Sequence, residues 1–202
     1  MLKVEDYIVF IKSQDGLTEG VGVLVGKHLI TAGHVIEKAG AASFCFKRQT
    51  IYLKKEDALL YCYMDKDDYS FNGYDIAIFR FEQIDSPLIL SMEKPDKSKE
   101  YLNISYHYVR ITKSEVNYPA IFKTSYHLEQ QKSIVEISEM NTDNFMTCHT
   151  SILLHEGSSG SPLLNSSNEV AGILCAGYPG TNKCVFQSAT SILKLMKKDN
   201  IQ

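Results

Sequence analysis

Several features are missing from this chain of 202 residues, and each absence excludes a class of protein. Lysine and arginine total 21 against 24 aspartates and glutamates, so the formal charge is −3 and no basic surface for nucleic acid is expected. No apolar run approaches the roughly 18–20 residues that span a bilayer. The first residues carry no pattern of a secretory leader. We therefore expect a cytoplasmic protein without nucleic-acid or membrane partners.

Cysteine is too scarce and too scattered for a disulfide framework or a zinc ribbon. The five cysteines, an odd number with no CxxC pair, are Cys45, Cys62, Cys148, Cys175 and Cys184. Reduced and mostly buried thiols are the simplest interpretation, although one Cys175–Cys184 bridge stays open. His149 and His155 lack a third ligand at metal spacing, and no phosphate-binding glycine motif occurs. No metal and no cofactor are expected.

Short β-branched and aromatic runs recur along the chain, separated by turn-prone segments. The runs are Tyr7–Ile11, Val21–Val25, Phe44–Phe46, Leu59–Tyr63, Asp75–Phe81, Tyr101–Tyr106, Ile134–Ile137 and Val170–Leu174. Apolar positions after Ser188–Ser191, interspersed with lysines, predict one helix at the C-terminus. The pattern predicts an all-β protein, and 44% hydrophobic with 22% charged residues excludes a disordered chain.

The strand pattern lapses between Ser86 and Glu100, in a polar segment that contains proline. We interpret this segment as the connection between two β halves, residues 1–90 and residues 91–202. Each half has about 100 residues, which is enough to bury a core of its own.

Three short segments contain residues with catalytic potential. Thr31–Val35 places His34 at the end of an apolar strand. Asp75 stands at the start of another apolar run. The segment Glu156–Leu163 contains two glycines and three serines and lies between apolar strands. Each has an ordinary structural explanation: a packed histidine, a strand-start aspartate and a Gly/Ser turn. Acyl transfer, however, needs a serine beside amide donors turned toward one point, and glycine permits such a backbone.

Taken together, in the order His, Asp, Ser, the segments resemble those of the chymotrypsin-like serine proteases. That family has T-A-x-H, D-I-A-[IL] and G-x-S-G-[GS]-P in this order, and the resemblance extends from Gly20 to about Ala189. It is strongest to compact bacterial members such as glutamyl endopeptidases and high-temperature-requirement proteases. It implies two antiparallel six-stranded β-barrels with a C-terminal helix, together one peptidase domain with the active site between the barrels.

The resemblance also implies a serine endopeptidase that hydrolyses a protein or peptide substrate through an acyl-enzyme. Ser159 of the second barrel would be the nucleophile, and His34 of the first would be the general base. Asp75, also of the first barrel, would orient and stabilise the imidazole. The backbone N–H groups of Gly157 and Ser159 would form the oxyanion hole.

Substrate binding is implied at the strand Leu174–Gly177, along which a peptide would pair through its main chain. The expected substrate-binding residues are Leu153, Leu154, Cys175, Ala176 and Gly177, with the strand Cys184–Phe186 as a further wall. Leu153 stands where trypsin has its acidic selector, and Leu174 stands where glutamyl endopeptidases have a histidine. An apolar or small residue before the scissile bond is therefore expected, with His155 as a loop residue at the pocket rim or in solvent.

Three departures from the family bear on regulation. Ser158 replaces the aspartate that receives a new N-terminal amine in secreted trypsins, so that activation switch has no acceptor. Val35 replaces a cysteine of a disulfide, and Cys175 replaces a serine that usually bonds to the triad aspartate. The oxyanion hole is expected to be ordered instead by the chain's own loops or by a regulatory protein partner bound near residues 140–157. Two alternatives stay open: a pseudoprotease that binds peptides without cleaving them, and a secreted protease whose leader has been removed.

Overall fold

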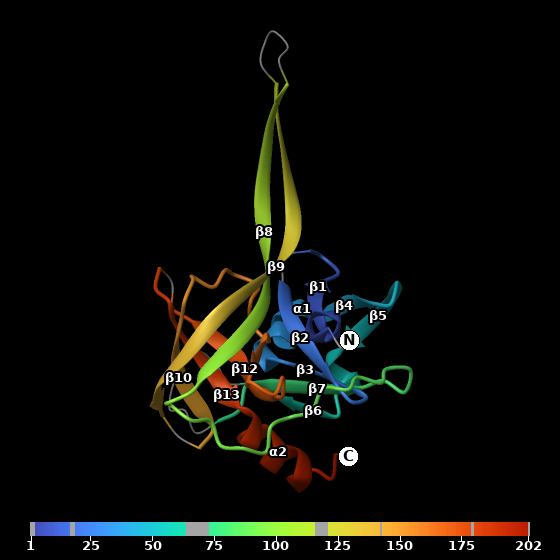
Figure 1. The fold of residues 1–202 in the computed structure, drawn as a ribbon. Helices are drawn as coiled ribbons and strands as arrows, with labels where there is room; N and C mark the ends of the chain where they lie inside the picture. Colours follow the sequence, from blue (N-terminus) through green and yellow to red (C-terminus); the bar gives the residue numbers. More distant parts are fainter. Residues whose placement is uncertain are drawn as a thin grey trace.

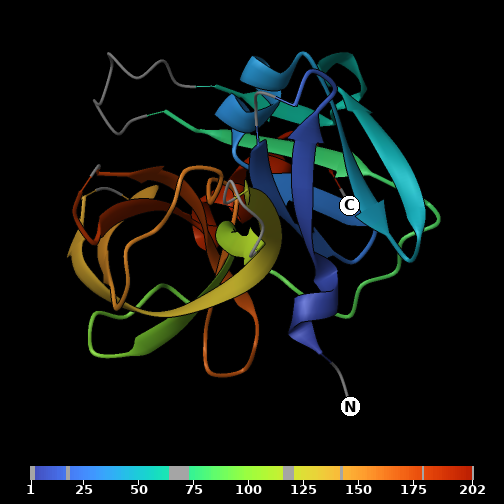
Figure 2. The same cartoon turned by 90° about the horizontal axis from the view of Figure 1, so that it is seen from above.

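The computed structural model describes residues 3–16, 19–63, 73–115, 121–141, 143–178 and 180–201, with the backbone alone over 108–115 and 121–126. Two β structures lie side by side and are joined by a long connection (Figures 1 and 2). The predicted all-β architecture with a C-terminal helix is confirmed. Among the described residues, no helix combines the length and the apolar character needed to cross a membrane.

The N-terminal half is an antiparallel sheet of seven strands in the order β5-β4-β1-β2-β3-β7-β6. Its strands are β1 (Ile8–Ser13), β2 (Glu19–Val25), β3 (His28–Thr31), β4 (Ala41–Phe46), β5 (Gln49–Lys54), β6 (Leu60–Cys62) and β7 (Ile76–Arg80). A short helical segment, η1 (Val4–Tyr7), precedes β1, and two more lie between strands: α1 (Gly33–Ala39) and η2 (Lys55–Asp57). The sheet curls as a half-barrel, so this half differs in strand count from the expected six-stranded barrel.

The C-terminal half is a closed six-stranded barrel, as expected, in the order β10-β13-β12-β11-β8-β9. Its strands are β8 (Glu100–Glu115), β9 (Ile121–Met140), β10 (Phe145–Thr150), β11 (Pro162–Leu164), β12 (Val170–Gly177) and β13 (Lys183–Ser188). Helix α2 (Ala189–Lys198) follows β13 directly. The hydroxyl of Ser188 caps α2 by accepting a hydrogen bond from the Ser191 amide at 3.2 Å.

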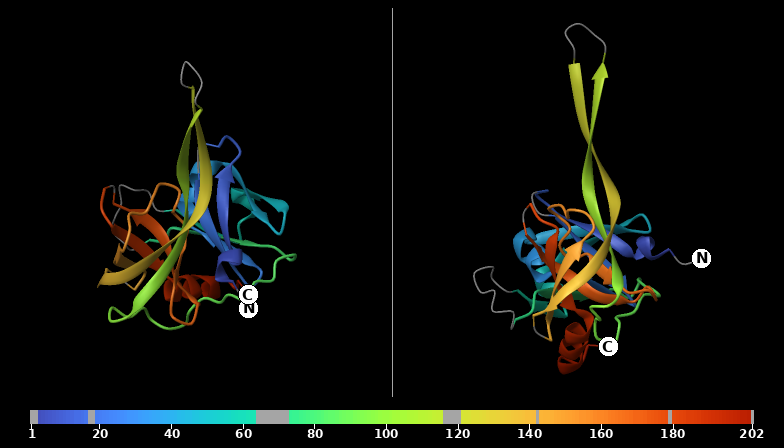
Figure 3. Two further views of the ribbon diagram at one scale, coloured as in Figure 1. Left: turned by 45° about the horizontal axis from the view of Figure 1, so that its top comes forward. Right: turned by 60° about the vertical axis from the view of Figure 1, so that its left-hand side comes forward.

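Strands β8 and β9 extend far beyond the barrel as a two-stranded arm (Figures 1 and 3). They pair residue by residue from Glu100↔Glu136 to Glu115↔Ile121. Among the described strands, β8 and β9 have a further partner only at their barrel ends, where β11 pairs with Leu102 and Asn103, and β10 pairs with residues 135–140. The sequence predicted strands only over Tyr101–Tyr106 and Ile134–Ile137, the parts close to the barrel. Along the arm no third described strand imposes the alternating burial on which such predictions depend.

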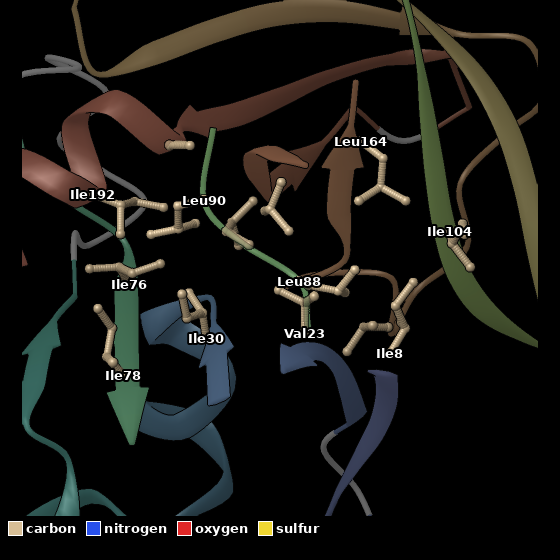
Figure 4. Close-up of a cluster of buried hydrophobic side chains, with 14 of the residues drawn as sticks. Ile8, Val23, Ile30, Ile76, Ile78, Leu88, Leu90, Ile104, Leu164 and Ile192 are labelled. Atoms are coloured by element: carbon tan, nitrogen blue, oxygen red, sulfur yellow. The ribbon is translucent and has the colours of Figure 1, made fainter. Parts of the chain in front are cut away.

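An apolar cluster joins the two halves and the connection between them (Figure 4). Ile30 and Ile76 contribute from the first sheet, Leu164 from the barrel, and Ile192 from α2. Leu88 belongs to the connection and lies in the same cluster. Burying these side chains stabilises the fold by roughly 1.5–3 kcal/mol each. The shared cluster therefore holds the facing surfaces of the two halves in a fixed arrangement.

The five cysteines are all free thiols, so the Cys175–Cys184 bridge that the sequence left open is not formed. Cys148, Cys175 and Cys184 are buried, whereas Cys45 is exposed. Burial raises the pKa of Cys184 to about 12, because a thiolate is poorly solvated in an apolar interior. The buried thiols therefore pack as small apolar side chains.

Candidate active site

His34 lies in the first turn of α1, immediately after β3. The turn depends on Gly33, because a Cβ at that position would lie 2.1 Å from the Cys62 carbonyl oxygen of β6. Only glycine lets the start of α1 approach β6 so closely. The His34 side chain is 12% exposed, so the imidazole is largely shielded yet borders the space between the halves.

Asp75 stands just before β7 and holds His34 at two points. Its Oδ1 accepts a hydrogen bond from the His34 main-chain N–H at 2.8 Å, and its Oδ2 lies 2.7 Å from His34 Nδ1. A carboxylate can only accept, so Nδ1 carries the proton in this contact. In the neutral imidazole, Nε2 then keeps a free lone pair, which is the form that a general base requires.

The second half of the molecule holds the main chain of Asp75. Gln187 Oε1 of β13 accepts from the Asp75 amide at 2.9 Å. Cys175 Sγ of β12 lies 3.6 Å from the Asp75 carbonyl oxygen, so the thiol contacts the main chain rather than the carboxylate. Burial and the nearby Asp75 charge raise the pKa of Cys175 well above its usual range. The thiol therefore stays protonated and is a weak donor.

Ser159 lies in a tight loop, Glu156–Ser161, that is bonded to both halves. Its carbonyl oxygen accepts from the Val21 amide of β2 at 2.8 Å. The next amide, that of Gly160, donates to the Leu174 carbonyl of β12 at 2.7 Å. These bonds fix the loop at the junction of the first sheet and the barrel.

Two glycines with positive φ shape this loop. Gly157 has φ +87° and Gly160 has φ +88°, a region that other residues rarely adopt. Within the described part of the chain, neither the Gly157 amide nor the Ser159 amide donates a hydrogen bond. Two amides only two residues apart are thus free to bind an anionic oxygen.

A cleft of about 730 Å³ lies between the halves and contains His34 and Ser159. All five expected substrate-binding residues line it: Leu153, Leu154, Cys175, Ala176 and Gly177. The expected wall Cys184–Phe186 does not line it, because those side chains are buried in the apolar clusters of the barrel. Lys183, the residue before them, lines the cleft instead, as do Asn182 and Thr181.

The charges along the cleft are balanced. Glu19 and Lys38 line it on the first half, and Glu156 and Lys183 line it on the second. Lys183 Nζ lies 5.0 Å from the centre of the Tyr178 ring, a cation–π contact. The described residues of the cleft therefore present no field of one sign to a substrate.

Other polar side chains of this region have different surroundings. Ser158 and Ser161 are buried, and the Ser161 hydroxyl accepts from Asn103 Nδ2 at 2.8 Å. His155 is exposed at the cleft rim and stacks on His107 of β8 with ring centres 5.4 Å apart. Among the described contacts, no hydrogen bond joins Ser159 Oγ to His34 Nε2. Such bonds are often long before substrate binds and shorten in the complex with substrate.

The sequence matches the trypsin-like peptidase domain over residues 20–173. The chain belongs to this family. The match covers the segments of His34, Asp75 and Ser159. Family and fold together support a protease, and a search of curated proteins found no match to this trypsin-like peptidase.

Solved structures share the fold of this trypsin-like peptidase at low identity. The serine endoprotease from Yersinia pestis has a TM-score of 0.66 at 17% identity, covering 98% of this chain and 67% of that one. Rv3671c from M. tuberculosis, in an inactive form, has a TM-score of 0.63 at 15% identity, covering 98% and 88%. A scabies mite inactivated protease paralogue has a TM-score of 0.66 at 11% identity, covering 96% and 91%.

The sequence analysis did not identify Gln187 as part of the peptidase site. Gln187 follows the apolar residues Cys184–Phe186 of β13 and is completely buried. A long polar side chain at the end of an apolar strand was the available signal, because a buried amide must find a partner. Nothing in the sequence indicated that this partner would be Asp75, which lies 112 residues earlier.

Proposed function

We propose that this peptidase is a serine endopeptidase with Ser159 as nucleophile, His34 as general base and Asp75 as the orienting carboxylate. The observation that carries the proposal is the 2.7 Å contact between His34 Nδ1 and Asp75 Oδ2, at a cleft that Ser159 also lines. The contact leaves Nε2 as the basic nitrogen on the imidazole. In this proposal, residues 1–90 and residues 91–202 are two halves of one peptidase domain.

Each of these groups has a defined role in the proposed acyl transfer. Ser159 Oγ attacks the substrate carbonyl while its proton passes to His34 Nε2. The imidazolium is stabilised by Asp75 and then protonates the leaving amine. The free amides of Gly157 and Ser159 bind the oxyanion of the tetrahedral intermediate. Water, activated by the same histidine, then hydrolyses the acyl-enzyme and regenerates the serine.

The edge of β12 supports binding of an extended peptide. Ala176 and Gly177 pair with Val185 and Cys184 of β13 on one side. No described strand pairs with them on the other side, because β11 ends opposite residues 170–173. A substrate main chain would add there as a further antiparallel strand. Such pairing depends on the main chain and leaves side-chain selection to the adjacent pocket.

A fluorophosphonate probe tests the proposed nucleophile directly. The probe should label wild-type protein on Ser159, as read by peptide mass, and should not label Ser159→Ala. Profiling of new protein termini in a proteome treated with wild type, against the same proteome treated with Ser159→Ala, would then identify the substrate. Failure to label folded wild-type protein would contradict the proposal.

The residue before the scissile bond is predicted to be apolar or small. Leu154 and the 51% exposed Leu153 line the adjacent part of the cleft, and the ammonium of Lys183 faces Tyr178. In a peptide library varied at this position, kcat/KM for Leu, Val or Ala should exceed that for Lys, Arg or Glu at least about tenfold, roughly 1.4 kcal/mol. A preference for a charged residue would contradict the prediction, and Ser159→Ala is the background control.

Activation is predicted not to depend on N-terminal trimming. Ser158, at the position that would need a carboxylate, carries a buried hydroxyl without a described hydrogen-bond partner. Protein beginning at Met1, at Leu2 or after a short tag should hydrolyse one peptide at rates within about tenfold of each other. Intact mass before and after the assay excludes self-cleavage. A hundredfold gain that requires removal of N-terminal residues would overturn this prediction.

A second candidate function is a peptide-binding pseudoprotease controlled by a partner. The observation that favours it is the missing hydrogen bond between Ser159 and His34 among the described contacts. A folded protein that binds peptides in the cleft but is not labelled by the probe would support this function. The cytoplasmic location and the regulatory partner stay predictions under either function.

A further inference from the structure

Gln187 is a completely buried side chain that crosses from one half of the molecule to the other. It lies on β13, where its neighbours in the sheet are Phe145 of β10 and Ile173 of β12. A strand paired on both sides is a rigid support. From this support the side chain reaches the main-chain amide of Asp75 in the first half, at 2.9 Å.

The orientation of the Gln187 amide follows from its partner. The Asp75 N–H can only donate, so the atom that faces it must be Oε1 and cannot be Nε2. Nε2 is buried and has no hydrogen-bond partner among the described atoms. Burying the unpaired Nε2 lowers the stability of the fold. The bond from Oε1 to Asp75 is therefore kept at the cost of leaving the other end of the same amide without a partner among the described atoms.

The bond to Gln187 holds the main chain of Asp75, and the carboxylate at the other end of the residue holds His34. That carboxylate bonds to His34 through both oxygens, at 2.8 Å to the main-chain N–H and 2.7 Å to Nδ1. A shift of the Asp75 main chain by about 1 Å would break or lengthen both bonds, and displacements of this size can lower rates about 100-fold. The other contact from the barrel is weaker, because the Cys175 thiol lies 3.6 Å from the Asp75 carbonyl.

We propose that Gln187 is a positioning residue for the His34–Asp75 pair: its side-chain carbonyl, held by the second half, fixes the Asp75 main chain in the first half. The expected effect on kcat rests on the proposed function, whereas the contact between Gln187 and Asp75 exists whether or not the protein turns over a substrate. Gln187 touches no substrate and acts only through Asp75. The arrangement of the two halves is thereby coupled to the orientation of the catalytic histidine.

Two substitutions separate this role from simple packing. Gln187→Met keeps the length of the side chain and removes the acceptor, so kcat should fall about 10–100-fold while KM stays within about twofold. Gln187→Glu keeps a carbonyl oxygen in place, and beside Asp75 a second buried carboxyl stays protonated. Its C=O accepts the same N–H, so kcat should return to within about threefold of wild type.

Thr147→Val is the matched control for loss of a buried polar contact in the same barrel. Thr147 is buried on β10, and its hydroxyl donates to Asn141 Oδ1 at 2.9 Å, away from Asp75. Its kcat should stay within about twofold of wild type. Should Gln187→Met fail to fold, Gln187→Asn serves instead, because losing one methylene withdraws the carbonyl about 1.5 Å and breaks the same bond.

A spectroscopic measurement tests the inference without any substrate. The proton between His34 Nδ1 and Asp75 Oδ2 should give a far-downfield proton NMR signal in wild type and in Ser159→Ala. The signal should weaken or move upfield in Gln187→Met and Gln187→Asn, and should be unchanged in Thr147→Val and Gln187→Glu. An unchanged signal in a folded Gln187→Met protein would overturn the inference.

The kinetic outcomes are equally decisive. Wild-type kcat in Gln187→Met, or an equal loss in Gln187→Glu and Gln187→Met, would overturn the positioning role. If wild type shows no turnover and no probe labelling, the proposed function fails, and the NMR signal still decides whether Gln187 sets the His34–Asp75 contact.

Discussion

Replacing Ser159 by alanine is expected to lower kcat on the order of 10⁶-fold while the fold stays intact. The reason is that no other hydroxyl of the loop is placed to attack a carbonyl in the cleft. His34→Ala should cause a loss of the same order, because nucleophile and base act as one unit. Hydrolysis of an accepted peptide, with circular dichroism to check folding, measures both effects.

The two neighbouring serines provide matched controls. Ser158 is 2% exposed and Ser161 is 0% exposed, so neither hydroxyl is available to substrate. Ser161→Ala removes the acceptor of Asn103 Nδ2, which also donates to the Pro162 carbonyl at 2.9 Å, so we expect a modest loss of stability with substantial turnover retained. Loss of turnover in folded Ser158→Ala alone would show that Ser159 is not the nucleophile.

The segments around His34 and Ser159 could be identified from the sequence because each combines a reactive side chain with a local backbone requirement, and Asp75 because it completes the order His, Asp, Ser of the family that the chain resembles. Gly33 must be glycine to let α1 start against β6, and Gly157 must be glycine to reach a φ of +87°. Such requirements are local and leave a mark in a single sequence. The structure brings His34 and Ser159 to one cleft, and it places Asp75 Oδ2 2.7 Å from His34 Nδ1.

Contacts between residues far apart in sequence could not be predicted in this way. The bond from Gln187 to Asp75 depends on how two separately formed sheets meet. The inward orientation of Cys184 and Phe186 depends on the register of β13 against β12, which shifts between Leu174 and Ala176. Register is a property of strand pairs, so it cannot be inferred from the residues of one strand alone.

Strand β5 shows a different limit of the sequence pattern. It pairs with β4 through a two-residue turn at Lys47 and Arg48, which both have positive φ (48° and 67°). Turns of this kind usually contain asparagine or glycine, and this one contains neither. The hairpin therefore lacks the usual turn signal, and β5 is one of the strands that the sequence did not predict.

Gly160→Ala is expected to cause the largest loss of stability of any single methyl group added to the active-site loop. A Cβ at Gly160 would lie 2.0 Å from the Val21 carbonyl oxygen and 2.4 Å from Thr31 Oγ1. The Thr31 hydroxyl already donates to that carbonyl at 2.6 Å, so neither atom can move aside without breaking a buried hydrogen bond. The positive φ of +88° adds backbone strain of about 1–2 kcal/mol.

Strain and overpacking together should destabilise Gly160→Ala by about 2–5 kcal/mol. The loop would also move away from β2, which carries the 2.8 Å bond from Val21 to the Ser159 carbonyl, so kcat/KM should fall more than about 100-fold. Gly26→Ala is the matched control, because Gly26 also has positive φ (+54°) but nothing lies within 4 Å of its Cβ position. It should lose only about 1–2 kcal/mol and keep its activity. Urea unfolding and peptide hydrolysis measure both variants, and equal stability losses would show that the contact with Val21 does not restrict the loop.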